Sequence, residues 1–182
     1  MDLPLKTRLA LRWNRSQEKS NRNVGLALRN EKYPFSNLLV LLPKNSDHSR
    51  KARMFIQSLQ NAIGPEGRIQ VRYIAMRRNL EFVDSSINDR LITYSNEHIN
   101  RWGLPYKSFL EIVFTTQPDA VIDLNLDFDP VSATIVQQSN APMRIGFYTE
   151  ESEKYYNILI DRKGSDYIEK GFRNIQQLLG LV

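Results

Sequence analysis

The stretch from 119 to 147 constrains the fold of this chain more than any other part of the sequence. It opens with the apolar run Ala-Val-Ile at 120–122, which is typical of a strand buried on both faces of a parallel sheet. Asp129-Pro130 predicts a helix start, because aspartate is a good N-cap and proline is accepted in the first turn. The helix should run over 131–139 and end before Pro142, since proline disfavours helix in the residue before it. Residues 143–147 predict a second strand, so the unit indicates a parallel pair with a right-handed crossover.

The same alternation of strands and helices extends over the rest of the chain. It predicts a three-layer α/β sandwich with a mainly parallel, doubly wound sheet. The strands at 38–42 and 120–124 should lie at its centre. Ligands in such sheets bind beyond the carboxyl ends of the strands. The loops that follow the predicted strands there are 43–48, 76–79, 94–97, 124–129 and 147–153. The other predicted strands are at 69–75, 91–94 and 155–160, and residues 76–90 should form a loop with a short helix. Further helices are predicted at 47–63, at 106–116 and from Ser165 or Asp166 to Gly180. Ser46 or Asp47 should cap the helix at 47–63.

Charge is distributed unevenly along the chain. Residues 1–35 hold eight basic and three acidic side chains, whereas the remaining residues hold 17 of each sign, so the whole excess of +5 lies in the first segment. This asymmetry predicts a basic N-terminal arm at 1–35, followed by a neutral α/β domain at 36–182.

The arm should be helical from Pro4 to about Lys19, with Leu5, Leu9 and Trp13 on one face. One interpretation is an amphipathic helix that packs on the domain and leaves its basic face in water. The alternatives are contact with nucleic acid or a ribosome, contact with an anionic membrane surface, or disorder. The candidate partner-binding residues are Lys6, Arg8, Arg12, Trp13, Arg15, Lys19 and Arg22.

Composition excludes several classes of protein. The chain has no cysteine, which rules out disulfides and thiolate metal sites, and its two histidines lie far apart. No apolar run approaches the ~20 residues needed to span a bilayer. The N-terminus lacks the apolar core of a signal peptide, so we expect a cytoplasmic protein.

Two sequence blocks resemble a known bacterial family. The apolar strand followed by Asp-Leu at 120–125, and Ala-Pro-Met-Arg-Ile-Gly-Phe at 141–147, resemble the late part of the N-terminal domain in the lipopolysaccharide heptosyltransferases. Those enzymes are GT-B glycosyltransferases that use ADP-heptose-type donors. The resemblance covers about 36–182 and implies the acceptor-side half of a GT-B fold. It does not include the C-terminal domain that places the nucleotide-sugar.

The turn after the first strand departs from that family. In the family this turn carries a Gly-Asp pair, with the aspartate proposed as the base for the acceptor hydroxyl. Here the nearest acid is Asp47, and no glycine precedes it. Asp47 is therefore the candidate catalytic residue, with helix capping as its other interpretation. The turn has no glycine with which to approach a phosphate, so no nucleotide cofactor is expected.

Polar residues near the predicted strand ends supply the remaining candidates. Asn45, Asn125 and Asp127, together with Arg144 of the second family-like block, are the candidate pocket residues. Asp123, Asp127 and Asp129 could ligate a divalent cation, but the glycine and the distal glutamate of a calcium loop are missing. We therefore predict no metal. Asp129 is instead interpreted as a helix cap, and Asp123 as an acceptor for backbone N–H groups.

Three functions agree with these features. The first is a non-catalytic binding or scaffold protein that contacts another protein or complex through the basic arm. The second is the acceptor-side subunit of a glycosyltransferase that works with a separate donor-binding chain. The third is an RNA- or ribosome-associated protein. Because the glycine turn is missing, the first interpretation is preferred and an enzyme is not expected.

Overall fold

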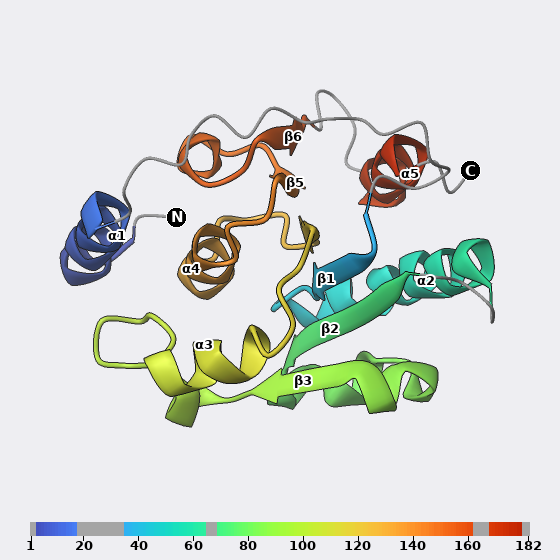
Figure 1. Ribbon diagram of the computed structural model, residues 1–182, viewed down its shortest axis with the longest axis horizontal. Helices are drawn as coiled ribbons and strands as arrows, with labels where there is room; N and C mark the ends of the chain where they lie inside the picture. The colour runs from blue at the N-terminus through green and yellow to red at the C-terminus, as the bar shows by residue number, and fades with distance from the viewer. Residues whose placement is uncertain (1–2, 18–34, 65–68, 162–167, 180–182) are drawn as a thin grey trace.

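A single parallel sheet forms the centre of the molecule (Figure 1). The computed structural model describes residues 3–17, 35–64, 69–161 and 168–179. Within these residues the strand order is β3-β2-β1-β4-β5-β6, and every neighbouring pair is parallel. The strands are β1 (Asn37–Leu41), β2 (Gln70–Met76), β3 (Leu91–Tyr94), β4 (Ala120–Asp123), β5 (Met143–Phe147) and β6 (Ile158–Ile160).

The prediction that the first and fourth strands are central is confirmed. From β1 the chain winds outward through β2 and β3, then crosses to β4 and winds the other way. The topological switch point therefore lies between β1 and β4, which pair with Leu41 opposite Asp123. Every residue of β4 is buried, as expected for a strand covered on both faces.

Helices cover both faces of this sheet, which confirms the predicted three layers. In Figure 1, α2 and α5 lie on one side and α1, α3 and α4 on the other. Successive residues of β1 alternate between two cores, so that Val40 packs toward α2 and α5 while Leu41 packs toward α3 and α4. The helices are α1 (Leu5–Gln17), α2 (Ser46–Ile63), α3 (Lys107–Val113), α4 (Pro130–Gln138) and α5 (Ile168–Leu178), with 3-10 helices η1 (Arg77–Phe82), η2 (Ser85–Arg90), η3 (Asn96–His98) and η4 (Ser152–Lys154).

The N-cap of α2 differs by one residue from the predicted Ser46 or Asp47. Asn45 is the cap, and its Oδ1 accepts hydrogen bonds from the backbone N–H of Asp47 at 2.9 Å and of His48 at 3.2 Å. Asn45 has the extended backbone of a cap residue, and its short amide reaches both amides. Asp47 is an exposed acid in the first turn.

The last strand is shorter than the predicted 155–160. The backbone N–H groups of Tyr155 and Tyr156 bond to Ser152 O at 3.0 and 3.1 Å, so the chain is still turning there and β6 begins only at Ile158. Both tyrosines are buried in the core instead. The predicted cap and stop of the last helix lie outside the described residues.

The helix α1 packs against α4. The face in contact is not the Leu5, Leu9 and Trp13 face that one interpretation of the sequence packed on the domain. Thr7 and Leu11 are 5% and 4% exposed, whereas Leu5, Leu9 and Trp13 are 72%, 53% and 67% exposed. The packed face carries small or medium side chains, which lets α1 approach closely. Thr7, for example, lies over Gly103: a Cβ atom added to Gly103 would be 3.4 Å from Thr7 Oγ1.

This contact makes α1 part of the packed structure. Seven consecutive residues of α4, 131–137, are buried, because the sheet covers one side of this helix and α1 covers another. In the described part of the chain, none of the helices has the length and apolarity to cross a membrane.

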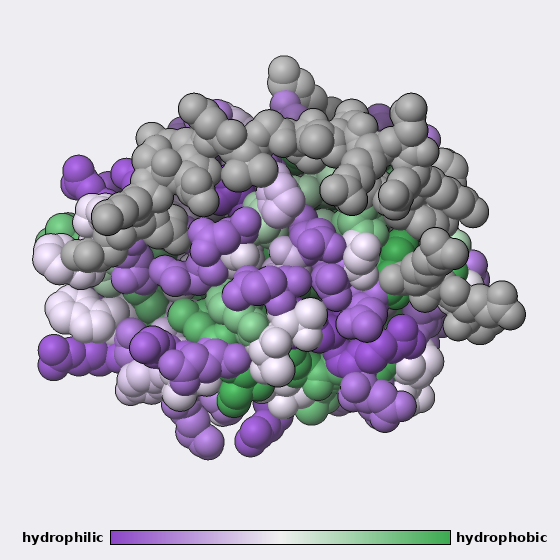
Figure 2. All heavy atoms as spheres, in the orientation of Figure 1, coloured by the Kyte–Doolittle hydropathy of each residue, from purple (hydrophilic) through white to green (hydrophobic). Residues whose placement is uncertain are grey.

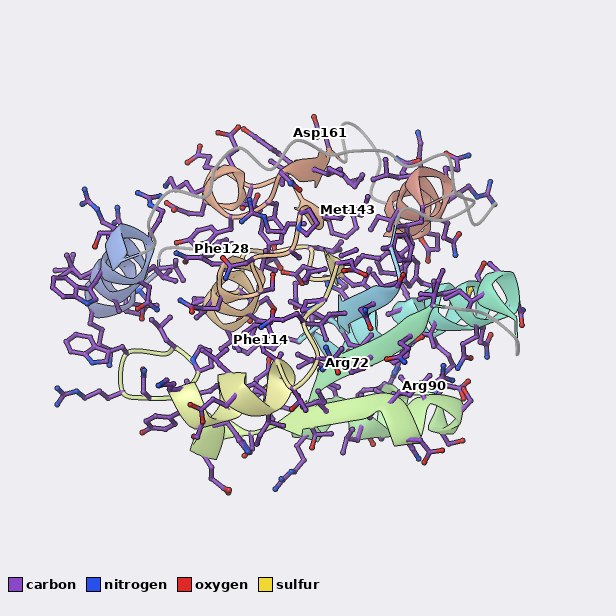
Figure 3. The ribbon with its side chains drawn as sticks, viewed as in Figure 1. Arg72, Arg90, Phe114, Phe128, Met143 and Asp161 are labelled. Atoms are coloured by element: carbon purple, nitrogen blue, oxygen red, sulfur yellow. The ribbon has the colours of Figure 1, made fainter. Side chains whose placement is uncertain are left out.

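Hydrogen bonds from Arg72 of β2 connect the end of α3 to the sheet. The Arg72 guanidinium donates to the carbonyl oxygens of Val113, at 2.6 Å, and of Thr116. Figure 3 shows Arg72 and Phe114 in this area, where the helix gives way to the turn before β4. The bonds supply partners for carbonyls that a helix end leaves unpaired.

Candidate functional site

The loops that follow β1 and β4 meet at the switch point. The backbone N–H of Lys44 donates to Asn125 Oδ1 at 2.8 Å. Asn125 donates in turn to Asp123 Oδ1, through its backbone N–H at 2.9 Å and its Nδ2 at 2.7 Å. Its Nδ2 is also 3.1 Å from Ser132 Oγ. The candidate residues Asn45 and Asn125 are thus brought to the same edge of the sheet, and Asn125 joins the two loops.

A salt bridge crosses the same point. Lys44 Nζ lies 3.1 Å from Asp129 Oδ1, while Asp129 Oδ2 accepts from Ser132 N at 3.0 Å as the N-cap of α4. This confirms the predicted cap. Because the Asp129 side chain is only 8% exposed, the lysine neutralises a carboxylate that has little access to water. The sequence interpretation missed this role of Lys44, although its position directly after a buried strand marks it as a switch-point residue.

A buried tyrosine closes the inner side of the network. Tyr156 OH donates to Asp123 Oδ2 at 2.5 Å, across 33 residues of sequence. Burial raises the pKa of Asp123 to about 7, against the lowering effect of the hydrogen bonds from Tyr156 and Asn125. Burial also raises the pKa of Tyr156 well above its usual value. Asp123 is only 3% exposed, so this carboxyl group lies inside the fold, where its hydrogen bond with Tyr156 joins β4 to the segment after β5.

Several polar groups of the turn after β1 are bonded within the protein. Asn79 Nδ2 donates to Pro43 O at 3.1 Å and to Lys44 O at 2.9 Å. Asn45 occupies two of the amides at the start of α2, and the negative Asp47 follows. The Asn45 side chain therefore already accepts from two of the backbone N–H groups to which a phosphate would bind.

The candidate residue Asp127 lies apart from Asp123 and Asp129. It lines a crevice of about 420 Å³ between α1 and the loop after β5, together with Arg8, Glu150 and Glu151. Figure 3 shows Phe128, which lines the same crevice, above α4 in that view. The three aspartates therefore do not converge. No group of three or more His, Asp or Glu side chains in the described ranges is arranged to hold a metal ion.

The remaining candidates are spread over the molecule. Arg144 lies on β5 in register with Val121, nearer the amino ends of the strands than Asn125. The candidate basic side chains of α1 lie at the surface, with Arg15 half-buried and Lys6, Arg8 and Arg12 exposed. Lys19 and Arg22 lie outside the described residues.

A second depression lies between α1 and the segment 99–110, which leads from β3 into α3. This groove has a volume of about 710 Å³. Trp13, which is 67% exposed, lines one wall and Trp102, which is 40% exposed, lines the other. Nothing local in the sequence indicates that the turn at Trp102 comes to lie beside α1. The other lining residues are Leu9, Ala10, Asn14, Asn100, Leu104, Pro105, Lys107, Leu110, Thr134 and Gln138.

Comparison with known proteins places most of the chain in one family. Residues 9–173 match a family of unknown function, DUF6913, and the chain belongs to that family. The match begins within α1 and ends within α5, so it includes every strand of the sheet. No curated protein and no solved structure matches the chain.

Proposed function

We propose that this member of the DUF6913 family is a non-catalytic binding or scaffold protein that contacts a partner through the surface formed by α1. The observation that carries the proposal is the internal bonding of the switch point. In a doubly wound sheet this crevice is the usual ligand site. Here Lys44 is paired with Asp129, and Asp123 is bonded to both Asn125 and Tyr156. A ligand entering the crevice would have to break these bonds and leave buried polar groups without partners.

We further propose that the domain corresponds to the acceptor-side half of a GT-B glycosyltransferase fold. Two features support this. The two blocks that resemble the heptosyltransferases coincide with β4 and β5, and the sheet has the order of a dinucleotide-binding fold. A fold can be shared without an activity, so this relationship does not itself predict catalysis.

Calorimetric titration of the full chain with ADP- and UDP-sugars tests the binding proposal. We expect no saturable heat, because no phosphate cradle is available at the start of α2. A GT-B enzyme measured with the same ligands provides the positive control. A micromolar dissociation constant, equivalent to about −8 kcal/mol, would refute the proposal. The variants Lys44→Ala and Asp47→Asn would then locate the site.

One observation favours the second function, an acceptor-side glycosyltransferase subunit. Asp47 is exposed in the first turn of α2, at the position where the resemblance implies a base. On this interpretation Asp47→Asn should abolish sugar transfer measured together with a donor-binding chain. Asp89→Asn, at another exposed acid, is the matched control. Transfer that survives Asp47→Asn would exclude Asp47 as the base.

A further inference from the structure

Three large apolar side chains that are exposed in the described part of the chain, Leu9, Trp13 and Trp102, line the groove between α1 and 99–110. In the described part of the chain ten large apolar residues are exposed, and six of them lie on α1, on the segment 99–110 or on α3. Isolated apolar residues are common at protein surfaces, but a cluster of this kind marks an interaction site. The six are Leu5, Leu9, Trp13, Trp102, Tyr106 and Ile112.

The groove has two apolar walls and a recessed base. Leu9 and Trp13 line the side formed by α1, and Trp102 and Pro105 line the opposite side. Thr134 of α4 also lines the groove and is only 1% exposed, so it lies deep between the walls. Figure 1 shows α1 at one end of the molecule, with α4 between α1 and the sheet and the loop that leads into α3 below them in that view.

This shape selects among possible occupants. A flat lipid surface would rest on the two tryptophans and leave the base of the groove empty. Arg101 lies over the Trp102 ring at 5.2 Å from its centroid, which leaves one face fewer on which a nucleic-acid base could stack. A helix can fill such a depression, because its side chains at i, i+3/i+4 and i+7 project from one face.

The charge around the groove specifies the partner further. Residues 3–17 contain four basic side chains and residues 99–110 contain two, and neither stretch contains an acid. Arg8 of the first stretch lines the other crevice, beside Glu150 and Glu151, so the remaining five are the basic groups available to the groove. Lys107 lines the groove itself and has only a solvent-exposed pairing with Glu111 at 3.7 Å. A second copy of this chain would bring two basic surfaces together and is disfavoured.

We propose that this groove binds an acidic amphipathic helix of a partner protein. The apolar face of that helix would lie between Trp13 and Trp102, and its carboxylates would face the basic rim. Tryptophan and arginine are enriched among the residues that dominate binding energy in protein interfaces, and both types are present here. The proposal rests on the proposed binding function and names the class of partner.

The tryptophans provide a direct assay. The chain has only two, and both line the groove, so intrinsic fluorescence reports on its occupancy. The probe is a synthetic peptide of about 18 residues, or five helical turns, with leucine along one face and glutamate elsewhere. We expect a saturable blue shift with the full chain. Two control peptides, one with lysine in place of glutamate and one with the same composition scrambled, should give no shift.

Matched variants locate the binding. Leu9→Glu should weaken binding about thirtyfold, or about 2 kcal/mol, because it places a carboxylate on the wall of the groove. Met54→Glu is its control, since Met54 is 70% exposed on α2, across the sheet. Lys107→Glu should weaken binding and reduce its salt dependence, whereas Lys170→Glu on α5 should not.

Four results would overturn the proposal. The first is the absence of a shift with the acidic peptide while circular dichroism shows a folded protein. The second is equal binding by wild type and Leu9→Glu. The third is a shift with phosphatidylserine vesicles or an RNA oligomer and none with the peptide. The fourth is a self-association that Leu9→Glu abolishes. Failure of the peptide leaves the nucleotide-sugar titration unaffected, and nucleotide-sugar binding would refute the proposed function whatever the peptide does.

Discussion

The packing of α1 on α4 can be tested by the same substitution at two positions of one helix. Leu11 is 4% exposed and belongs to the core on the α3 and α4 side, whereas Leu5 is 72% exposed. Leu11→Ala should lower the free energy of unfolding by about 3 kcal/mol, within the range for buried leucines. For a chain of this length the melting temperature should fall by about 6 to 12 °C.

The control is Leu5→Ala. Alanine favours helix at least as well as leucine, so neither substitution weakens α1 through its intrinsic propensity. At the exposed position we expect a change within about 0.5 kcal/mol. The difference between the two variants therefore measures packing alone.

Urea denaturation followed by far-UV circular dichroism is the appropriate assay. The free-energy change is taken from the shift in midpoint, provided that the slope is the same as in wild type. Equal destabilisation by the two substitutions would refute the packing of α1 through Leu11. A change of less than about 0.5 kcal/mol at Leu11 would show that α1 is not part of the core.

Two further predictions concern the buried pair and its surroundings. Burial raises the pKa of Asp123 to about 7. Between about pH 4 and 7 the folded protein therefore keeps a proton that the unfolded chain has lost. The free energy of unfolding should fall as the pH rises through this window, by at most about 4 kcal/mol. Asp123→Asn should remove that fall, and denaturation series of both proteins from pH 4 to 8 measure it; parallel curves would contradict the prediction. Gly146→Ala should destabilise the protein by about 1 to 3 kcal/mol, because its Cβ would lie 2.6 Å from Cδ1 of the Tyr156 ring. Calorimetric melting checks this, and an unchanged melting temperature would show that the ring can move aside.

The candidate site combines groups that were predicted with groups that were not. Asn45, Asn125 and Asp129 could be identified because each follows a strand or precedes a helix, where polar side chains bond to nearby backbone. The bond from Tyr156 to Asp123 could not be predicted. It joins segments 33 residues apart, and no local pattern selects one tyrosine over its neighbour.

The groove shows the same division. The sequence predicted that Trp13 lies on one face of a helix with Leu5 and Leu9, and one interpretation packed that face on the domain. In the structure it is exposed, because α1 packs on α4 and on the turn at Gly103 through the face that carries Thr7 and Leu11. The hydrophobic pattern of a helix identifies an apolar stripe without specifying which neighbour covers it.

The sequence by itself therefore determined the order and type of the elements, and the central position of β1 and β4. Continuous apolar runs, caps and prolines act within a few residues, and right-handed crossovers limit how such units assemble. Only the tertiary structure decided that Lys44 and Tyr156 close the switch point, and that Trp13 faces Trp102 across an open groove. These contacts join residues far apart in the chain, so they depend on how whole elements pack and on which surfaces the packing leaves uncovered.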